Sequence, residues 1–306
     1  MSRPGPRSSV LNRCAWRLAF AGLALGCAGP APPPAEPFLT PLAWQARRPG
    51  QPGTLYLLGS IHVGSARERR LSPTLIEAWR SSDELVVEVD LDASSAAMAR
   101  EWAQRAYLPA GRHLGDVLSP ETRQLLSEYL KSHGLDPARF SSLKPWAVLL
   151  QLARIEFERA GFPAEQGVDR RFLNEAAGRK PVVALESYAL QLDLYDGFSF
   201  EVQEMMLRDL LEPSDPYETK ALVDAWERGD EQAFLDLLFP DSERWRPYRE
   251  RFFYQRNENM ARKLEGLERD GRTRFVVVGV GHMVGPRGIP ALLATQGWVV
   301  ERIGGP

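Results

Sequence analysis

Two of the four histidines lie in the same short pattern, Gly-x-x-His, and each follows an apolar run. His62 ends residues 59–62 (Gly-Ser-Ile-His) after the run at 54–58, and His282 ends the same pattern after the run at 274–278. Apolar runs of this length with glycine at their borders predict buried strands, so each histidine is expected where a strand ends. Glycine at such a turn lets the backbone bend sharply or approach a ligand closely. The repeated pattern therefore predicts two imidazoles that could face one site.

Two glutamates are expected at the ends of two further strands. Glu88 lies in the run at 84–90, and Glu186 ends the run at 180–186. If these strands are parallel neighbours, all four groups meet at one sheet edge, where ligands of open α/β sheets collect. Two imidazoles and a carboxylate can hold a divalent metal ion and leave positions for water or substrate. Such an ion lowers the pKa of bound water and polarises a carbonyl, as hydrolysis of an amide or ester requires.

The residue types suggest roles for these groups but do not choose between the two glutamates. His62 and His282 are the expected imidazole ligands, and either Glu88 or Glu186 could be the third ligand. The remaining carboxylate could act as a general base or orient a histidine. Asp90 lies on the same run as Glu88 and is an alternative to it.

Arg256 and Asn257 are a further supporting pair, within a segment that is rich in aromatic residues and helical in pattern. They could bind an anion or form hydrogen bonds within the site. An exposed helix face would explain the pair equally well.

Other chemistries fit these residues less well. Ser60, Ser65 and Ser187 lie near the expected site, but none is in the Gly-x-Ser-x-Gly turn of serine hydrolases. The glycines of residues 279–285 do not have the Gly-x-Gly-x-x-Gly spacing of a dinucleotide loop. A structural protein is a further alternative, and it predicts that the four strand-end groups are scattered.

The elements that must position these groups alternate along the chain. Runs at 42–46 and 54–58 predict a hairpin, and Ser72-Pro73 has the cap and first-turn proline of a helix start. Residues 119–161 and 200–267 are mostly helical in pattern. The expected fold class is α/β, with a central mixed β-sheet built from N- and C-terminal strands and a helix-rich middle packed as a cap.

The composition is that of a globular protein. The chain has 306 residues, of which 44% are hydrophobic and 25% charged, with a formal net charge of -2. The body contains no basic run of the kind that forms a nucleic-acid surface. We therefore expect no nucleic-acid partner.

The first 27 residues have the pattern of an export signal. Four arginines precede a short apolar segment that ends in small residues and Cys27, as in the lipobox of bacterial lipoproteins. Cys27 is the expected lipidation site, and secretion with cleavage near Ala28 is the alternative. Residues 28–39 are a proline-rich linker, and residues 40–306 are expected to form a single domain.

The expected location is the cell envelope, with the membrane surface as a partner through the lipid anchor. Ala28 stands where aspartate is associated with retention in the inner membrane, so an outer-membrane lipoprotein facing the periplasm is favoured. Cys14 and Cys27 are the only cysteines, so the mature body can form neither a disulfide nor a cysteine-based metal site.

The order of these motifs resembles the TraB/GumN family over about residues 40 to 303. Ser60 and Ser187 stand where threonine is commoner in that family. The motifs that carry the resemblance are residues 58–64 (Leu-Gly-Ser-Ile-His-Val-Gly), 86–90 (Val-Val-Glu-Val-Asp), 167–169 (Gly-Val-Asp), 181–187 (Pro-Val-Val-Ala-Leu-Glu-Ser), 256–257 (Arg-Asn) and 278–285 (Val-Gly-Val-Gly-His-Met-Val-Gly).

The family is similar to the Tiki proteins, described as metal-dependent proteases with two Gly-x-x-His motifs and a glutamate, and more distantly to erythromycin esterases and ChaN-type haem-binding lipoproteins. The resemblance implies His62, Glu88 and His282 as metal-binding and catalytic residues, with Glu88 as a ligand or a base and with Glu186 and Arg256 in support. It implies manganese or cobalt as cofactor, and the ligand types would also accept zinc.

The favoured function is therefore an extracytoplasmic metal-dependent hydrolase, with a peptidase as the favoured kind. The alternative is a non-catalytic lipoprotein that binds haem or a peptide signal in the same crevice.

Overall fold

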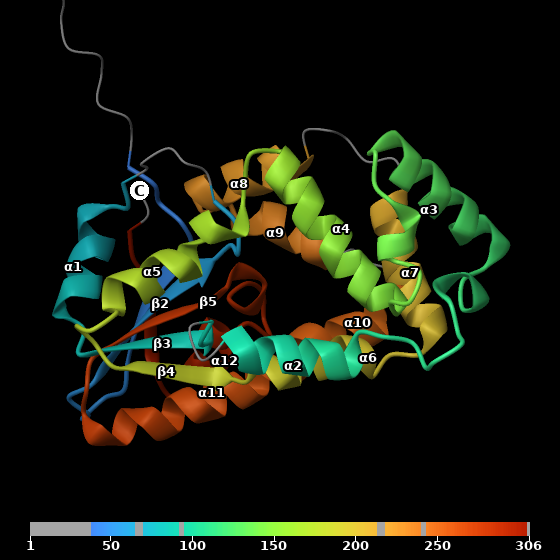
Figure 1. Ribbon diagram of the computed structural model, residues 1–306. Helices are drawn as coiled ribbons and strands as arrows, with labels where there is room; N and C mark the ends of the chain where they lie inside the picture. The colour runs from blue at the N-terminus through green and yellow to red at the C-terminus, as the bar shows by residue number, and fades with distance from the viewer. Residues whose placement is uncertain (1–37, 65–69, 92–94, 213–217, 240–242, 305–306) are drawn as a thin grey trace, which may run out of the picture. The chain divides into compact units, whose positions relative to one another are not determined.

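Four parallel strands form the part of the sheet that carries the predicted histidines and glutamates. In the computed structural model, the strands make one six-stranded sheet in the order β4-β3-β5-β2-β1-β6 (Figure 1). The strands are β1 (Ala43–Arg47), β2 (Thr54–Ser60), β3 (Glu84–Val89), β4 (Val182–Glu186), β5 (Arg274–Gly279) and β6 (Val299–Arg302).

The structure describes residues 38–64, 70–91, 95–212, 218–239 and 243–304. The expected export signal, Cys27 and all but the last two residues of the expected linker lie outside these residues. Leu39, at the end of that linker, forms a bridge with Leu71. The predictions of lipidation and membrane anchoring therefore remain predictions.

The register of the parallel strands sets the place of the site. Strands β4, β3, β5 and β2 are parallel, whereas β1 runs antiparallel to both β2 and β6, so the sheet is mixed as expected. Ser60 pairs with Gly279, and Val89 pairs with Glu186. The carboxyl ends of all four parallel strands therefore lie at one edge.

The neighbouring strands β3 and β5 are buried along their whole length, which explains why each contains a run of valines. Every residue of β3 and β5 is buried. Strands with helices on both faces need apolar side chains on both faces, so they lack the alternation of half-exposed strands. Helices α1 (Pro73–Ser81) and α5 (Val168–Ala176) cover one face, and α11 (Gln255–Leu267) and α12 (Ile289–Thr295) cover the other.

Helix α1 begins at the serine cap and first-turn proline that the sequence predicted. The Ser72 side chain accepts a hydrogen bond from the Leu75 amide at 3.4 Å, and Pro73 occupies the first turn. On the same face of the sheet, Trp79 packs against the rings of Phe172 and Phe275 at centroid distances of 5.2 and 5.5 Å. Local capping and aromatic packing therefore fix α1 on the sheet.

The middle of the chain forms a second, helical core around Trp146, as the expected cap requires. Its side chains come from segments that precede and segments that follow strand β4 in the sequence. The helices of this region are α2 (Ser95–Arg105), α3 (Pro120–Ser132), α4 (Pro145–Arg159), α6 (Tyr188–Asp196) and α7 (Phe200–Leu211), followed by α8 (Glu218–Arg228), α9 (Glu231–Leu238) and α10 (Arg246–Arg249).

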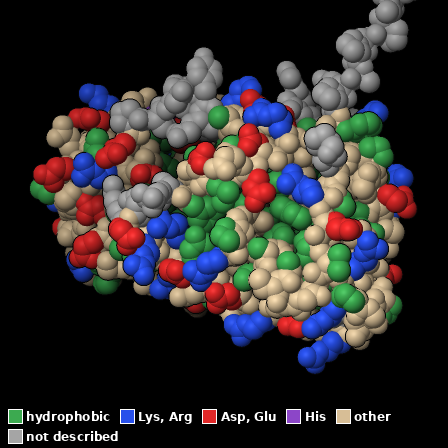
Figure 2. Space-filling view, turned by 180° about the vertical axis from the view of Figure 1, so that it is seen from behind, with side chains coloured by type: hydrophobic (Ala, Val, Ile, Leu, Met, Phe, Trp, Pro, Cys, Tyr) green, Lys and Arg blue, Asp and Glu red, His purple; other side chains and the backbone are tan. Residues whose placement is uncertain are grey.

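The surface in Figure 2 carries Lys and Arg interspersed with Asp and Glu, around hydrophobic side chains that gather near the middle of the face. None of the helices within the described ranges is both long and apolar enough to cross a membrane.

Candidate functional site

Gly279 marks the centre of the candidate site, because both histidines and Glu88 surround it. A methyl group placed on Gly279 at the Cβ position would lie 3.3 Å from Glu88 Oε2, 3.4 Å from His62 Nε2 and 3.6 Å from His282 Cδ2. The strand ends thus bring the three groups together, as the sequence predicted. A side chain at position 279 would occupy the space that they share.

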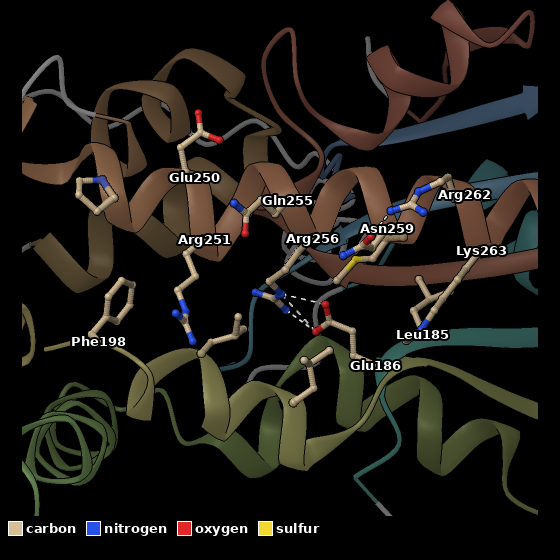
Figure 3. A pocket seen from close by; sticks show the side chains of 14 residues that line it. Leu185, Glu186, Phe198, Glu250, Arg251, Gln255, Arg256, Asn259, Arg262 and Lys263 are labelled. Carbon is tan, nitrogen blue, oxygen red and sulfur yellow. Dashed lines mark hydrogen bonds and ion pairs between the residues drawn. The ribbon is translucent and has the colours of Figure 1, made fainter.

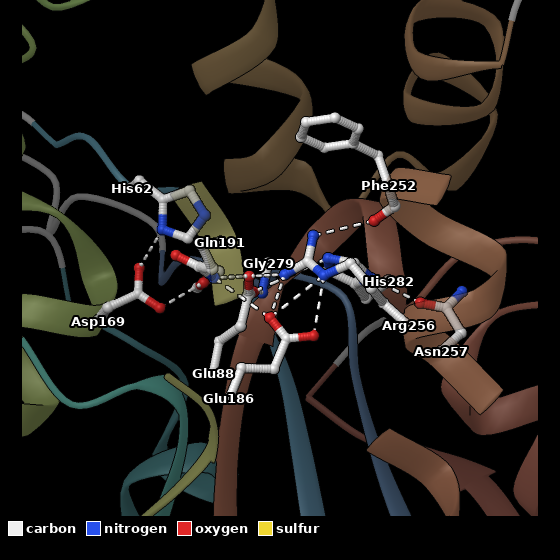
Figure 4. A network of polar contacts seen from close by, with 11 residues as sticks. His62, Glu88, Asp169, Glu186, Gln191, Phe252, Arg256, Asn257, Gly279 and His282 are labelled. Atoms are coloured by element: carbon white, nitrogen blue, oxygen red, sulfur yellow. Dashed lines mark hydrogen bonds and ion pairs between the residues drawn. The ribbon is translucent and has the colours of Figure 1, made fainter. Parts of the chain in front are cut away.

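The first histidine is held by a carboxylate from α5. His62 Nδ1 lies 3.0 Å from Asp169 Oδ2, and the Ser60 hydroxyl donates to Asp169 Oδ1 at 2.8 Å (Figure 4). The Val168 amide donates to Ile61 O at 3.1 Å, which fixes the start of α5 beside this turn. Gly167 permits that approach, because a Cβ atom there would lie 2.7 Å from His62 O. With Nδ1 committed to Asp169, Nε2 of His62 is directed toward Gly279.

This pairing favours the charged form of the imidazole. The negative charge of Asp169, with its hydrogen bond, raises the pKa of His62 to about 9. The side chain is 66% exposed, so solvent screens part of the attraction. His62 is therefore an exposed imidazolium at neutral pH when nothing is bound to Nε2.

The second histidine is held by an amide from α11. His282 ends a 3₁₀ turn, Val280–His282, and its Nδ1 lies 2.5 Å from Asn257 Oδ1. The Asn257 Nδ2 group donates to Arg287 O at 2.7 Å, which leaves Oδ1 as the acceptor facing the ring. Nδ1 of His282 therefore carries the proton, and the unprotonated Nε2 lies 3.9 Å from Glu88 Oε2.

Burial keeps His282 neutral. Its side chain is only 4% exposed, and desolvation of the charged form lowers its pKa to about 3 despite the facing Glu88. The two histidines thus differ in protonation state at neutral pH.

Glu88 is the centre of a buried ionic network. Its Oε2 accepts from the Gly279 amide at 3.1 Å, and its Oε1 accepts from Gln191 Nε2 at 2.6 Å and from Arg256 Nη2. Arg256 also binds Glu186 through Nε and Nη2, at 2.9 and 2.7 Å (Figure 4). One guanidinium therefore pairs with two carboxylates at the ends of adjacent strands, and it offsets only part of their charge.

The network sets the charge of its members. Burial works to raise the pKa of Glu88, but His282, Arg256 and His62 and the Gly279 amide together lower it to about 2. The two carboxylates raise the pKa of Arg256, although its desolvation opposes the rise. Glu88 is therefore a carboxylate at neutral pH and a weak base.

A π-helical turn, Glu250–Tyr254, positions Arg256 and Asn257. The Gln255 amide bonds to Glu250 O, five residues back, and the Arg256 Nη1 group returns to Phe252 O at 2.9 Å. Such turns insert one residue into a helix and are frequent at functional sites. Both side chains are buried, so the exposed helix face considered for this pair is wrong, and each of them binds a group of the site.

An open cavity of about 300 Å³ gives access to these groups. His62, Glu88, Asp169 and Gln191 line it, together with Glu165 and Arg170 and with groups at the end of β3 and before α5. The buried His282 is not among the lining residues. This volume is at the lower end of the range for small-ligand sites, about 300 to 1,000 Å³.

The donor set is of the type that binds a divalent metal ion. Both histidines have Nδ1 committed to an oxygen acceptor, an arrangement common for metal-ligating histidines. Nε2 of His62 faces the space beside Gly279, and Nε2 of His282 lies 3.9 Å from Glu88 Oε2. Glu88 Oε2 faces the same space. Within the described ranges, however, no three His, Cys, Asp or Glu side chains have the spacing of metal ligands. Metal binding therefore remains a proposal.

Comparison with protein families confirms the family resemblance expected from the sequence. The sequence profile of the TraB/PrgY/gumN family matches residues 42–302. The chain belongs to this family. No solved structure gives a significant match.

Relatives of the family include one from Escherichia coli and two from vertebrates. "Uncharacterized protein YbaP" of Escherichia coli is 31% identical over 138 residues, which cover 45% of this chain and 50% of that protein. "Metalloprotease TIKI1" of Danio rerio is 24% identical, over 80% of this chain and 60% of that protein. "Metalloprotease TIKI2" of Xenopus tropicalis is 24% identical, over 88% and 61%. The chain thus spans about half to three fifths of these relatives.

Two functional candidates escaped the sequence analysis. Asp169 lies in one of the family motifs, residues 167–169, yet its place beside His62 becomes visible only in the structure. Gln191 belongs to α6, a helix that the sequence pattern did not indicate. Of the two acids considered, Glu88 on β3 and Asp90 just after it, Glu88 is the one beside Gly279 and both histidines.

The serines have structural partners. The Ser60 hydroxyl donates to Asp169, and the Ser187 hydroxyl caps α6 by accepting from the Leu190 amide at 3.1 Å. Ser65 lies outside the described residues.

Proposed function

We propose that this chain is a metal-dependent hydrolase of the cell envelope, with peptides as its favoured substrates. The observation that carries the proposal is the meeting of His62, Glu88 and His282 around Gly279. The family membership and the printed names of the two vertebrate relatives, metalloproteases, point to the same class.

In this proposal His62, His282 and Glu88 hold a divalent ion, manganese, cobalt or zinc. When bound, the ion would supply Lewis-acid polarisation of a carbonyl and a lowered pKa of water. Asp169 and Asn257 orient the two imidazoles by accepting at Nδ1. His62 must give up its Nε2 proton before it can act as a ligand, so metal uptake is expected to increase with pH.

Hydrogen-bond donors around Glu88 decide which of its two carboxylate oxygens faces the histidines. Arg256 and Gln191 engage Oε1 of Glu88, which leaves Oε2 directed at the histidines. Because the pKa of Glu88 is about 2, it suits a ligand better than a general base. Glu186 supports this arrangement by binding Arg256 from the other side.

Elemental analysis combined with peptide hydrolysis tests the proposal. We expect about one divalent ion per native chain and its loss in the variant His62→Ala/His282→Ala, with loss of hydrolysis. His113→Ala, an exposed histidine outside the site, is the matched control and should keep both. A native protein that takes up none of the three ions and cleaves no peptide would contradict the proposal.

The exposed imidazole of His62 supports one alternative, a non-catalytic lipoprotein that binds haem or a peptide signal. Haem titration of the metal-free native protein distinguishes the two functions. A haem absorption band that is lost in His62→Ala, without hydrolysis in any metal, would favour the binding protein.

The proposed envelope location rests on Cys27 and the signal pattern before it. Incorporation of labelled fatty acid into the native chain and none into Cys27→Ser would support the anchor. Equal release of both proteins into the soluble fraction would favour plain secretion.

A further inference from the structure

A second pocket, of about 740 Å³, lies on the other side of the Glu186–Arg256 pair (Figure 3). It is formed between α6 with the end of β4 on one side and α11 with the preceding π-helical turn on the other. The proposed hydrolytic function makes no use of this pocket. Its volume lies within the range of small-molecule sites.

The two walls of this pocket differ in chemistry. Leu190, Leu194 and Phe198 recur at intervals of four along and just after α6, which gives an apolar stripe. Leu190 is 42% exposed, so an apolar ligand could still cover it. The facing wall presents Arg251 at one end and Arg262 and Lys263 at the other, as Figure 3 shows.

The positive charges of this wall are not matched by carboxylates. Arg251 donates to the main-chain oxygens of Asp193 and Gly197, at 2.8 and 3.4 Å, and Lys263 donates to Leu185 O. Arg262 donates to its own helix, at Glu258 O and the Asn259 side chain. Among the described residues no carboxylate lies within 4.0 Å of any of these three cations.

The carboxylates that do line the pocket are already engaged. Glu186 binds Arg256 at 2.7 Å, and Glu250 binds Arg287 at 2.8 Å. Some helical arginines elsewhere in this chain pair with an acid one turn away, as Arg208 does with Glu212 at 2.9 Å. The cations of this wall are therefore hydrogen-bonded to neutral oxygens of the protein and could still meet the negative charge of a ligand.

We infer that this pocket binds an anionic amphiphile with a carboxylate head on an apolar chain, as in a fatty acid. The head lies at Arg262 and Lys263, which are exposed, and the chain lies along Leu190, Leu194 and Phe198. Charge-assisted hydrogen bonds fix the head, and burial of apolar surface holds the chain. The inference does not depend on hydrolysis, because binding at this pocket needs no group of the candidate active site to react.

Calorimetric titration with dodecanoate, kept below the concentration at which it forms micelles, tests the inference. The full chain carrying Cys27→Ser is used, because it cannot be acylated. We expect saturable binding that Arg262→Gln/Lys263→Gln weakens roughly tenfold or more. Leu190→Ser should weaken it roughly fivefold. Dodecyltrimethylammonium, with the same chain and the opposite charge, should bind at least about tenfold more weakly.

Matched controls separate the pocket from binding elsewhere on the protein. Lys131→Gln removes an exposed cation from α3, and Leu237→Ser removes a leucine that is 43% exposed on α9. Both should bind dodecanoate as the unmodified pocket does. Absence of saturable binding, or equal affinity in the pocket variants and the controls, would overturn the inference. Peptide hydrolysis is measured on the same samples, so failure of the proposed function is recognised separately.

Discussion

The two Gly-x-x-His turns share a pattern and a sheet edge, yet they differ in almost every property that governs chemistry. His62 is 66% exposed and faces a carboxylate, whereas His282 is 4% exposed and faces an amide. Their pKa values lie on opposite sides of neutrality, at about 9 and about 3. The repeated motif therefore fixes where an imidazole lies, whereas the facing carboxylate of Asp169 charges the first imidazole and burial keeps the second one neutral.

This difference gives the site one cationic and one neutral imidazole around a single carboxylate. A pair of groups with separated pKa values is a common arrangement for assigning distinct roles at one pH. Three substitutions and a change of pH should test this difference between the two histidines and the network that surrounds them.

The largest effect is expected from Arg256→Met. The change leaves Glu88 and Glu186 buried without their counter-ion, which costs about 3 to 5 kcal/mol when one partner of a buried ionic network is removed. Urea unfolding followed by circular dichroism measures it. Arg262→Met, exposed on the same helix, should change stability by less than about 0.5 kcal/mol. Equal effects of the two substitutions would show that the network is not stabilising.

Asn257→Asp should make the second turn resemble the first. A carboxylate at Nδ1 of His282 favours the imidazolium, so its pKa should rise by roughly one to three pH units. Titration of the imidazole protons by NMR measures this rise. Asn259→Asp, two residues further along α11, should leave His282 unchanged. A titration of His282 that is the same in both variants would show that the Asn257 contact does not control it.

Asp169→Asn is the converse change at the first turn. Loss of the facing charge should return the pKa of His62 toward its ordinary value of about 6.5. The effect should be smaller than that at His282, because His62 is open to solvent. Glu165→Gln removes another carboxylate that lines the same cavity and serves as control. A His62 that keeps its high pKa in Asp169→Asn would assign the rise to another group.

The most gradual expected effect, small per pH unit, is a difference between the two arms of the pH–stability profile of the metal-free protein. The pKa of His282 is lower in the folded protein, so the unfolded chain binds its proton first and stability increases with pH between about 3 and 6.5. The increase is at most about 1.4 kcal/mol per pH unit. The pKa of His62 is raised, so its contribution is complete below about 6.5 and is lost as the pH rises through about 9.

Unfolding curves of His62→Gln and His282→Gln over pH 4.5 to 9.5 separate these two contributions. His282→Gln should flatten the profile between about 4.5 and 6.5, above the range where protonation of Glu88, with its pKa of about 2, takes over. His62→Gln should flatten it only above about 6.5. Variants that both keep the native profile would show that neither histidine contributes.

The positions of the site groups could be predicted from the sequence, but their interactions could not. Apolar runs with glycine borders located the strand ends, and parallel pairing of those strands then brings His62, Glu88 and His282 together. The partners that set their charges come from distant segments. Asp169 is 107 residues from His62, and Gln191 is 103 residues from Glu88. Such contacts depend on how α5 and α6 pack, for which local periodicity carries no information.

The π-helical turn before Arg256 makes the site sensitive to the length of the chain as well as to its composition. Removal of one residue from Glu250–Tyr254 would let an ordinary α-helix continue and would turn the preceding segment by about 100° relative to α11. The Phe252 carbonyl could then no longer accept from the Arg256 side chain in the same way. A single-codon deletion that spares every site residue could therefore separate Arg256 and Asn257 from the groups they now hold.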